Sequence, residues 1–132
     1  VRLERYIKNL GIEVDTLRSL VDTLILPACY AYHGVLASGV AAAKAAGVSA
    51  PQSETLVRLS GLVGTLQEKR VQLEACYRQV EVAKSDADKA KLLSSGVADA
   101  MLEVRQLCDE LESVVADDLW PLPKYREILF LS

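Results

Sequence analysis

The side chains of this chain best suited to chemistry are those of three cysteines and one histidine, Cys29, Cys76, Cys108 and His33. Cys29 and His33 lie four residues apart, so on a helix they share one face. That spacing can supply two ligands of a zinc site, which the other two cysteines would complete from other helices. However, no two of the four have the close C-x-x-C spacing of a zinc knuckle. We therefore interpret the cysteines as small core residues and His33 as a hydrogen-bonded helix residue, and we predict no metal ligand.

Covalent catalysis by Cys29 with His33 as its base would need a third, orienting group and a site for an oxyanion. The neighbouring sequence contains neither. Gly61 and Gly64 fall within a predicted helix and lack the lysine of a phosphate-binding loop. We predict that this chain has no catalytic residue and binds no cofactor of its own.

Three long amphipathic helices are predicted from apolar residues that recur every three or four positions, over residues 12–46, 53–83 and 86–117. The third is the most regular, with apolar residues at Leu93, Val97, Ala100, Val104, Leu107, Leu111 and Val114. Such stripes are typical of helix bundles, and short links make neighbouring helices antiparallel. We expect an all-α, up-down-up bundle of three helices in a single domain, residues 1–132. Residues 1–10 are interpreted as a connection from a preceding domain, and residues 118–132 as a non-helical C-terminal strip.

Glycine, proline and serine indicate where these helices end or bend. Gly11 separates a short helical lead-in from the first helix. Pro27 lies inside the first helix and removes a backbone hydrogen bond, which predicts a kink near residues 23–27. The residues suited to the helix ends are Gly47 as a C-cap, Ser49 or Ser53 as the cap of the second helix, and Ser85 as the cap of the third.

The composition excludes several classes of protein. Of the 132 residues, 51% are hydrophobic and 25% are charged, which is typical of a globular domain and not of a disordered chain. The net charge of −3 offers no basic surface for nucleic acid or anionic lipid. An odd number of widely spaced cysteines favours reduced thiols and a cytoplasmic location.

A membrane span has one candidate, residues 24–43, which carry no formal charge over about the length of a bilayer core. The same stretch contains a proline, two tyrosines, a histidine and two glycines, and it lacks flanking basic clusters. Because polar groups are costly in lipid, we interpret it as a buried, alanine-rich helix. The chain begins at Val1 inside an apparent helix, and we expect it to be part of a longer protein.

Arg70 interrupts the apolar seam of the second helix. Either its stem lies along the seam and its guanidinium reaches water, or it pairs with a carboxylate from the first or third helix and sets their register.

The C-terminal strip differs from everything before it: Trp120 is followed by Pro121 and Pro123, and then by an apolar end. The two prolines hold the backbone extended. Burying three of its large side chains would contribute several kcal/mol, at about 25 cal/mol per Å². We expect the strip to fold back on the bundle or to dock on a domain outside this chain.

The two ends of the chain resemble a known family. "WPLPKYREILF", residues 120–130, resembles the terminal motif of the long bacterial, type III glutamine synthetases, and "RYIKNLGIEVDTLRSLVDTLILPACYAY", residues 5–32, resembles the segment that follows their catalytic domain. The matching residues of the second motif are Tyr6, Lys8, Ile12, Glu13, Ile25, Leu26, Pro27 and Ala28. The middle third agrees only in its helical pattern, and Lys124 stands where the family is expected to have threonine.

The resemblance implies a parent protein that ligates ammonia to glutamate through γ-glutamyl phosphate, using ATP and Mg or Mn. Such enzymes form large double-ring homo-oligomers in the cytoplasm. The family's metal and nucleotide sites lie in its catalytic domain, so no catalytic residue is carried over to this chain. The family-motif residues that we expect to be structurally important are Pro27, Trp120, Pro121, Leu122, Pro123, Tyr125 and Phe130.

We therefore expect a non-catalytic C-terminal helical domain of a glutamine synthetase, used for subunit assembly or regulatory contacts. Its partners would be its own catalytic domain and neighbouring subunits, with neither nucleic acid nor a membrane among them. Two alternatives stay open: a free-standing helical module that binds a partner helix through its seams, and an independent metal-binding bundle built on the cysteines and His33.

Overall fold

The computed structural model describes residues 2–124, which form three long helical segments and contain no strand. The first segment contains α1 (Arg2–Leu20), the π-helical turn η1 (Val21–Ile25) and α2 (Leu26–Ala45). The second segment is α3 (Ser53–Val82). The third segment contains α4 (Asp86–Leu92), the π-helical turn η2 (Leu93–Val97) and α5 (Ala98–Val114). The prediction of an all-helical chain with three helical segments is confirmed. The three predicted ranges agree with these bounds to within a few residues, except at the start of the first.

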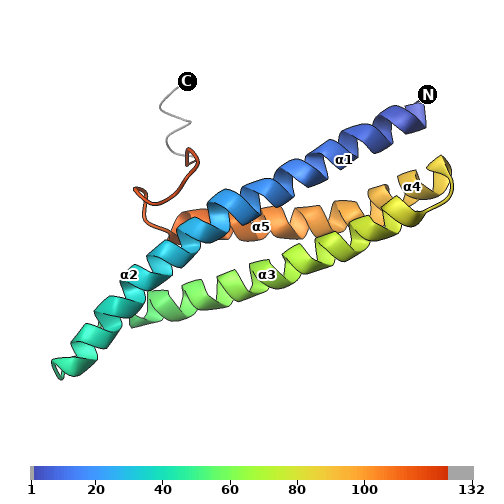
Figure 1. Cartoon of the computed structure of the whole chain (residues 1–132). Coiled ribbons are helices and arrows are strands. Elements are labelled where there is room, and N and C mark those ends of the chain that lie inside the picture. Colours follow the sequence, from blue (N-terminus) through green and yellow to red (C-terminus); the bar gives the residue numbers. More distant parts are fainter. Residues whose placement is uncertain (1, 125–132) are drawn as a thin grey trace.

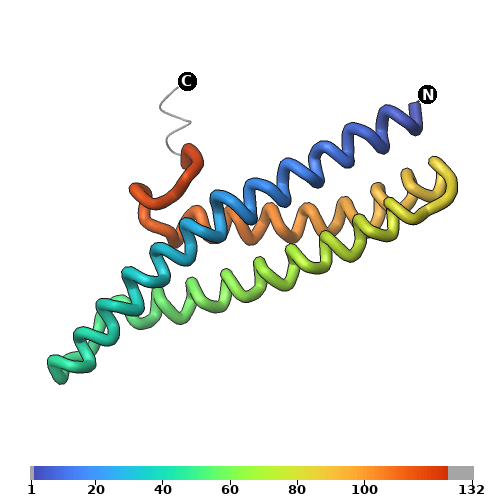
Figure 2. Tube along the Cα trace, viewed as in Figure 1, coloured from blue at the N-terminus to red at the C-terminus, as the bar shows by residue number. Residues whose placement is uncertain are grey.

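The first segment is a continuous helical rod of 44 residues, about 66 Å long at about 1.5 Å per residue. In Figure 1, α3 lies alongside this rod, and α4 and α5 lie against α3. Figure 2 shows the α3–α4 turn at the end of the molecule where the chain starts, and the α2–α3 turn at the opposite end. The chain therefore starts at one end of the rod, and the turn between α2 and α3 lies at the other end.

Gly11 does not interrupt the first helix, which begins at Arg2 and continues through it to Leu20. The expected connection over residues 1–10 is therefore helical from Arg2 onward. The glycine is buried because a side chain from α3 packs against it: a Cβ atom at Gly11 would lie 2.8 Å from the hydroxyl oxygen of Tyr77. Gly11 is a point of close helix approach and not a break.

Pro27 is the second residue of α2 and lies two residues after the end of the π-helical turn η1. Proline has no N–H group, so the helix loses one ordinary hydrogen bond here, and the N–H of Leu26 bonds to the carbonyl of Val21 in the wider π pattern. Such turns are a recognised way to absorb a local irregularity. The kink expected at residues 23–27 stays a prediction.

Two of the predicted caps are confirmed. Gly47 adopts φ +78°, the left-handed conformation that favours glycine, and ends the first helix. The Oγ atom of Ser85 accepts a hydrogen bond from the backbone N–H of Asp88 at 3.1 Å, so it caps α4. The expected serine cap of α3 is wrong: α3 begins at Ser53 itself, whose hydroxyl donates to the Ala50 carbonyl, and the capping position is Gln52.

The core lies between the three segments and is built from the residues that define the apolar stripes. Its fully buried members include Val14 and Val21 from the first segment, Leu59, Leu66 and Leu73 from α3, and Leu93, Val97, Val104 and Leu111 from the third. The α3 leucines recur every seven residues, which is the spacing of a helix packed in a bundle. The stripe predicted for the third helix is confirmed at Leu93, Val97, Ala100, Val104 and Leu111, which are all buried.

Among residues 2–124, the first segment is the one helix long and apolar enough, by length and composition, to cross a membrane. Of its most apolar 18-residue window, 28% is buried within the structure. The interpretation of residues 24–43 as a buried helix is therefore wrong: the stretch is helical, but only Ile25, Leu26, Cys29 and Leu36 within it are buried.

Candidate functional site

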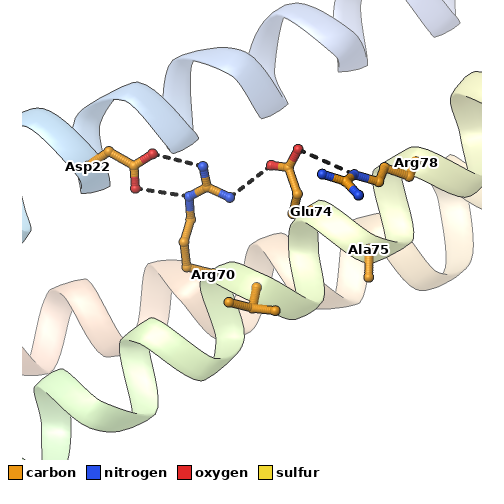
Figure 3. Close-up of a pocket in the computed structure, with 6 residues that line it drawn as sticks. Asp22, Arg70, Glu74, Ala75 and Arg78 are labelled. Atoms are coloured by element: carbon orange, nitrogen blue, oxygen red, sulfur yellow. Dashed lines mark hydrogen bonds and ion pairs between the residues drawn. The ribbon is translucent and has the colours of Figure 1, made fainter.

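A cluster of charged side chains, which we call the polar clasp, joins the first helical segment to α3. It consists of Asp15, Arg18, Asp22, Arg70 and Glu74. Asp22 lies on η1, where the helix is π-helical, and Arg70 lies on α3. Figure 3 shows the two side chains pointing toward each other across the space between the two helices.

The guanidinium of Arg70 binds both oxygens of Asp22. Its Nε lies 3.0 Å from Oδ1 and its Nη2 lies 2.8 Å from Oδ2, and the remaining Nη1 donates to Oε2 of Glu74 at 2.9 Å. Two parallel bonds between a guanidinium and a carboxylate fix both the distance and the orientation of the partners. Of the two readings of Arg70, pairing with a carboxylate of the first helix is therefore the correct one.

Arg18 makes the second connection between the same helices. Its Nη1 donates to Oε2 of Glu74 at 2.8 Å, it also pairs with Asp15 on its own helix, and its guanidinium carbon lies 5.3 Å from the ring centre of Tyr77. Glu74 thus accepts from two arginines, one on each helix. The clasp also sits one helical turn from Gly11, where the Tyr77 hydroxyl makes its close approach.

The clasp shifts the pKa of three of its members, Glu74, Arg70 and Arg18, in the direction that favours charge. Hydrogen bonds from Arg18 and then Arg70 hold the pKa of Glu74 below its ordinary value. The hydrogen bond to Asp22 raises the pKa of Arg70 and outweighs the opposite effect of burial. Burial alone would lower the pKa of Arg18, but its bonds to Glu74 and Asp15 raise it. At neutral pH Glu74, Arg18 and Arg70 are therefore charged and paired.

A shallow, open hollow of about 710 Å³ lies over the clasp, lined by Asp22, Arg70, Val71, Glu74, Ala75 and Arg78. Its charged groups are directed at one another, as the dashed lines of Figure 3 mark. Arg78 is the looser member, since its Nε lies 3.9 Å from Glu74 and its side chain is 75% exposed. The arrangement is suited to holding two helices in register.

Cys29 and Cys108 lie close enough for Cys29 to help raise the pKa of Cys108, but the three cysteines and His33 are not gathered into one site. Cys29 is buried, and burial raises the pKa of its thiol to about 11 and that of Cys108 to about 12. Thiols with such values stay protonated at neutral pH. His33 is hydrogen-bonded through Nε2 to Oγ of Ser60 at 2.9 Å. Within residues 2–124, no three His, Cys, Asp or Glu side chains gather as a metal site would require.

The described part of the C-terminal strip folds back on the bundle. Trp120 is 8% exposed and belongs to the core, while Leu119 and Leu122 pack against that core. Pro121 and Pro123 are exposed, as is Pro27 on the first helix. Tyr125 and Phe130 lie outside the described residues.

Lys124 holds the strip to the end of α5. Its Nζ donates to the carbonyl of Val115 at 2.6 Å and pairs with Oδ1 of Asp117, also at 2.6 Å, and its side chain is 11% exposed. Val115 follows the last residue of α5, where backbone carbonyls lack helical partners, so the lysine satisfies one of them.

Sequence reasoning singled out Arg70 but missed Asp22, Glu74 and Arg18. One signal was available: Arg70, Glu74 and Arg78 are spaced by four residues, so they line one face of α3 with alternating charge. The partner residues on the first helix could not be found this way, because their positions depend on how the two helices are packed.

Known proteins match this chain over its full length. Residues 1–44 match the family model described as the glutamine synthetase C-terminal domain. A type-3 glutamine synthetase from Dictyostelium discoideum is 36% identical over 99% of this chain. This chain is a glutamine synthetase C-terminal domain. A glutamine synthetase from Bacteroides fragilis is 26% identical over 98% of it.

The chain spans about a fifth of the length of these curated relatives, 19% in each case. The resemblance noted at the two ends of the sequence is therefore confirmed at the level of the domain. Asp15, Arg18 and Asp22 of the polar clasp lie within the residues that match the family model, and Arg70 and Glu74 lie outside them.

Proposed function

We propose that this glutamine synthetase domain is a non-catalytic contact domain, used for subunit assembly or regulatory contacts in a longer enzyme. The rest of that polypeptide carries out the ligation of ammonia to glutamate with ATP and Mg or Mn. The longer enzyme is a large cytoplasmic homo-oligomer. The partners of this domain are its own catalytic domain and neighbouring subunits, and not nucleic acid or a membrane.

The observation that carries this proposal is the way in which Arg70 is used. Its guanidinium binds Asp22 of the first segment with two hydrogen bonds and Glu74, on its own helix, with a third, so two of these three bonds join the two helices. Arg18 joins the same helices through Glu74. Two cross-links close together make the first segment and α3 a stiff pair, and stiffness is what a domain needs to hold other subunits at a fixed distance.

Within this domain, the three segments keep the up-down-up order, and the first is bent at Pro27. The family-motif residues have structural roles: Trp120 and Leu122 hold the strip on the bundle, and the exposed Pro121 and Pro123 stiffen it. The same roles explain why the strip combines aromatic, apolar and proline residues.

The proposal is tested by comparing the longer enzyme with a version that lacks this domain. Light scattering gives the mass of each assembly, and glutamine formation gives the activity. We expect the shortened enzyme to form smaller assemblies, and the separately produced domain, added back, to restore part of the mass. An assembly of unchanged mass without the domain would exclude a role in assembly.

A free-standing helical module is the alternative, and it would act without any catalytic domain. The alignment of nearly the whole chain to one fifth of two longer relatives favours the domain of an enzyme. Adding the separately produced domain to the shortened enzyme distinguishes the two hypotheses. A free-standing module would leave the mass of the shortened enzyme's assembly unchanged.

A further inference from the structure

The outer face of α3 carries a regular stripe of exposed residues. From Val57 to Val82, steps of four and three residues stay on one face of the helix, opposite the buried leucines of the same helix. Three valines of this stripe are largely exposed, Val57 at 73%, Val71 at 67% and Val82 at 78%. Gly64 in the stripe is half-buried and the other members are exposed. The stripe, which we call the outer seam, consists of Val57, Gly61, Gly64, Glu68, Val71, Ala75, Arg78 and Val82.

Two glycines of the outer seam have no role in the packing of this chain. A Cβ atom added at Gly61 or at Gly64 would meet no atom of the described chain within 4 Å. Glycine weakens the middle of a helix by about 1 kcal/mol relative to alanine, so an open position favours alanine. Glycine is suited to places where another backbone approaches closely. The two glycines therefore fit a second helix that lies against the outer seam and does not belong to this chain.

The outer seam carries one charge of each sign, and neither has a close ion pair within the domain. Glu68 is exposed and takes part in no ion pair within residues 2–124. The Nε atom of Arg78 lies 3.9 Å from Glu74, and the Arg78 side chain is 75% exposed. Glu68 and Arg78 are about 15 Å apart along the helix, too far to pair with each other. A second outer seam that runs in the opposite direction can place each of them beside an opposite charge.

One antiparallel register satisfies charge and size together. When Glu68 of one copy faces Arg78 of the other, a larger side chain faces a small one at the remaining positions of the overlap. A twofold axis then repeats every contact. The register one heptad away, in which the whole outer seam overlaps, instead places Glu68 against Val71. The facing pairs of the favoured register are Glu68 with Arg78, Val71 with Ala75, and Val82 with Gly64.

A concavity on the outer seam fits the same register. The hollow of about 710 Å³ over the polar clasp is lined by Val71, Ala75 and Arg78 of the seam. Ala75 and Arg78 lie on neighbouring turns of α3, and the alanine side chain is short (Figure 3). The hollow therefore has room beside Ala75 for the Val71 side chain of a second copy. Heptad stripes pack in this way, with a side chain of one helix inserted between side chains of the other.

Resting on the proposed assembly function, we propose that the outer seam of α3 is a contact site for the outer seam of a second copy of this domain, with the two helices antiparallel. The overlap covers residues 64–82 of each copy and is about 28 Å long. Because its side chains are short, the contact buries little area, and we expect a dissociation constant of about 0.1 mM or weaker between free domains. The contact becomes firm where the longer enzyme holds two copies close together. At the micromolar concentrations of an unfolding experiment, the free domain is monomeric.

Sedimentation equilibrium of the 132-residue chain, at concentrations up to about 1 mM, measures this association. We expect a monomer–dimer equilibrium. Gly64→Leu fills the space that faces Val82 of the other copy, twice in each dimer, and should weaken the dimer by about tenfold or more. Gly34→Leu is the matched control, since Gly34 lies on α2 and also has nothing within 4 Å of its added carbon. It should leave the dimer constant unchanged, and circular dichroism checks that both variants keep their helix content.

The charge pairing tests the direction of the two helices. Glu68→Arg and Arg78→Glu should each weaken the dimer, because both pairs then bring like charges together. The double variant should restore the dimer, since reversing both charges recreates both pairs. A parallel pair of helices would place Glu68 against Glu68 and would show no such rescue, which would overturn the proposed register.

A monomer at all concentrations, or a dimer that Gly64→Leu and Gly34→Leu affect equally, would overturn the inference. If the free domain stays monomeric but Gly64→Leu changes the mass of the longer enzyme, the outer seam binds a helix from elsewhere in that enzyme and not a second copy of itself. Either result leaves the proposed function standing if removing the domain still reduces the mass of the longer enzyme. The two failures are therefore distinguishable.

Discussion

Arg70 of α3 holds Asp22 of η1 through two parallel hydrogen bonds, with Nε 3.0 Å from Oδ1 and Nη2 2.8 Å from Oδ2. Removing either partner leaves the other without its main contact. We expect Arg70→Met and Asp22→Asn each to lower the free energy of unfolding, and the double variant to lower it by less than the sum. The coupling should be about 1 kcal/mol, since the pair is only partly buried. Urea unfolding of the four proteins measures it.

Arg78→Met is the control for this cycle. Arg78 lies on the same face of α3, but it is 75% exposed and 3.9 Å from Glu74. Its replacement should change stability by less than about 0.5 kcal/mol. Additive effects of Arg70→Met and Asp22→Asn would show that the bidentate pair contributes nothing to the register of the two helices.

Glu74 should make the stability of the domain depend on pH. Its pKa in the folded chain is lower than the ordinary value of 4.5, because it accepts hydrogen bonds from Arg18 and Arg70. The unfolded chain therefore binds more protons between these two values, so the stabilisation is complete above about pH 4.5 and is lost as pH falls through the folded pKa. We expect Glu74→Gln to destabilise the domain at pH 7 and to have a smaller effect at pH 3.

The same comparison with Glu68→Gln provides the reference, since Glu68 is an exposed glutamate of the same helix. Its effect should be small at both values of pH. Urea unfolding at pH 7 and pH 3 measures both variants. An effect of Glu74→Gln that is as large at pH 3 as at pH 7 would contradict the assignment of the stabilisation to the charged carboxylate.

The helices and the core could be predicted from the sequence because both depend on local patterns. The regular apolar stripe of the third helix predicted the buried face that contains Leu93, Val97, Val104 and Leu111, and Ser85 was predicted correctly as the cap of that helix. The polar clasp could not be predicted in full. Asp22 and Arg70 are 48 residues apart in the sequence, so their pairing depends on how the first segment and α3 are aligned.

Gly11 was misread for a related reason. Glycine usually weakens a helix, so Gly11 was interpreted as a break. The local sequence does not show that Tyr77 of α3 occupies the space that a side chain at position 11 would fill. The π-helical turns were missed as well. The turn at η1 accompanies Pro27, but no feature of residues 93–97 predicts the one at η2.

Trp120 anchors the C-terminal strip in the core, with 8% of its surface exposed. Replacing a buried tryptophan by alanine removes a large apolar area and leaves a cavity, so Trp120→Ala should lower the free energy of unfolding by about 3 kcal/mol or more. Pro121→Ala changes an exposed neighbour and should have an effect of less than about 1 kcal/mol. Thermal unfolding followed by circular dichroism separates the two, and an unchanged midpoint for Trp120→Ala would show that the strip does not pack on the bundle in solution.

Lys124 ties the same strip to the end of α5 through Val115 and Asp117. We expect Lys124→Met to loosen the strip while leaving the helices intact. Trp120 is the single tryptophan of the chain, so its fluorescence reports on the strip alone. Its emission should shift to the red and become easier to quench by acrylamide in the variant. Lys84→Met, at an exposed lysine in the α3–α4 turn, should leave the emission unchanged, and equal spectra for all three proteins would mean that Lys124 does not hold the strip.

Gly11 and Tyr77 should be energetically coupled, because they meet between the first segment and α3. A Cβ atom at position 11 would lie 2.8 Å from the tyrosine hydroxyl oxygen but 3.9 Å from the ring carbon that carries it, which is an ordinary contact distance. Alanine is favoured over glycine within a helix by about 1 kcal/mol. Gly11→Ala should therefore stabilise the chain in a Tyr77→Phe background, where the hydroxyl is absent, and should lose most or all of that gain in the wild type. Gly34→Ala is the control, since nothing lies within 4 Å of its added carbon, and it should stabilise both backgrounds equally. If Gly11→Ala behaves like Gly34→Ala in urea unfolding, the glycine is not retained to make room for the tyrosine, and the close approach of the two helices does not depend on it.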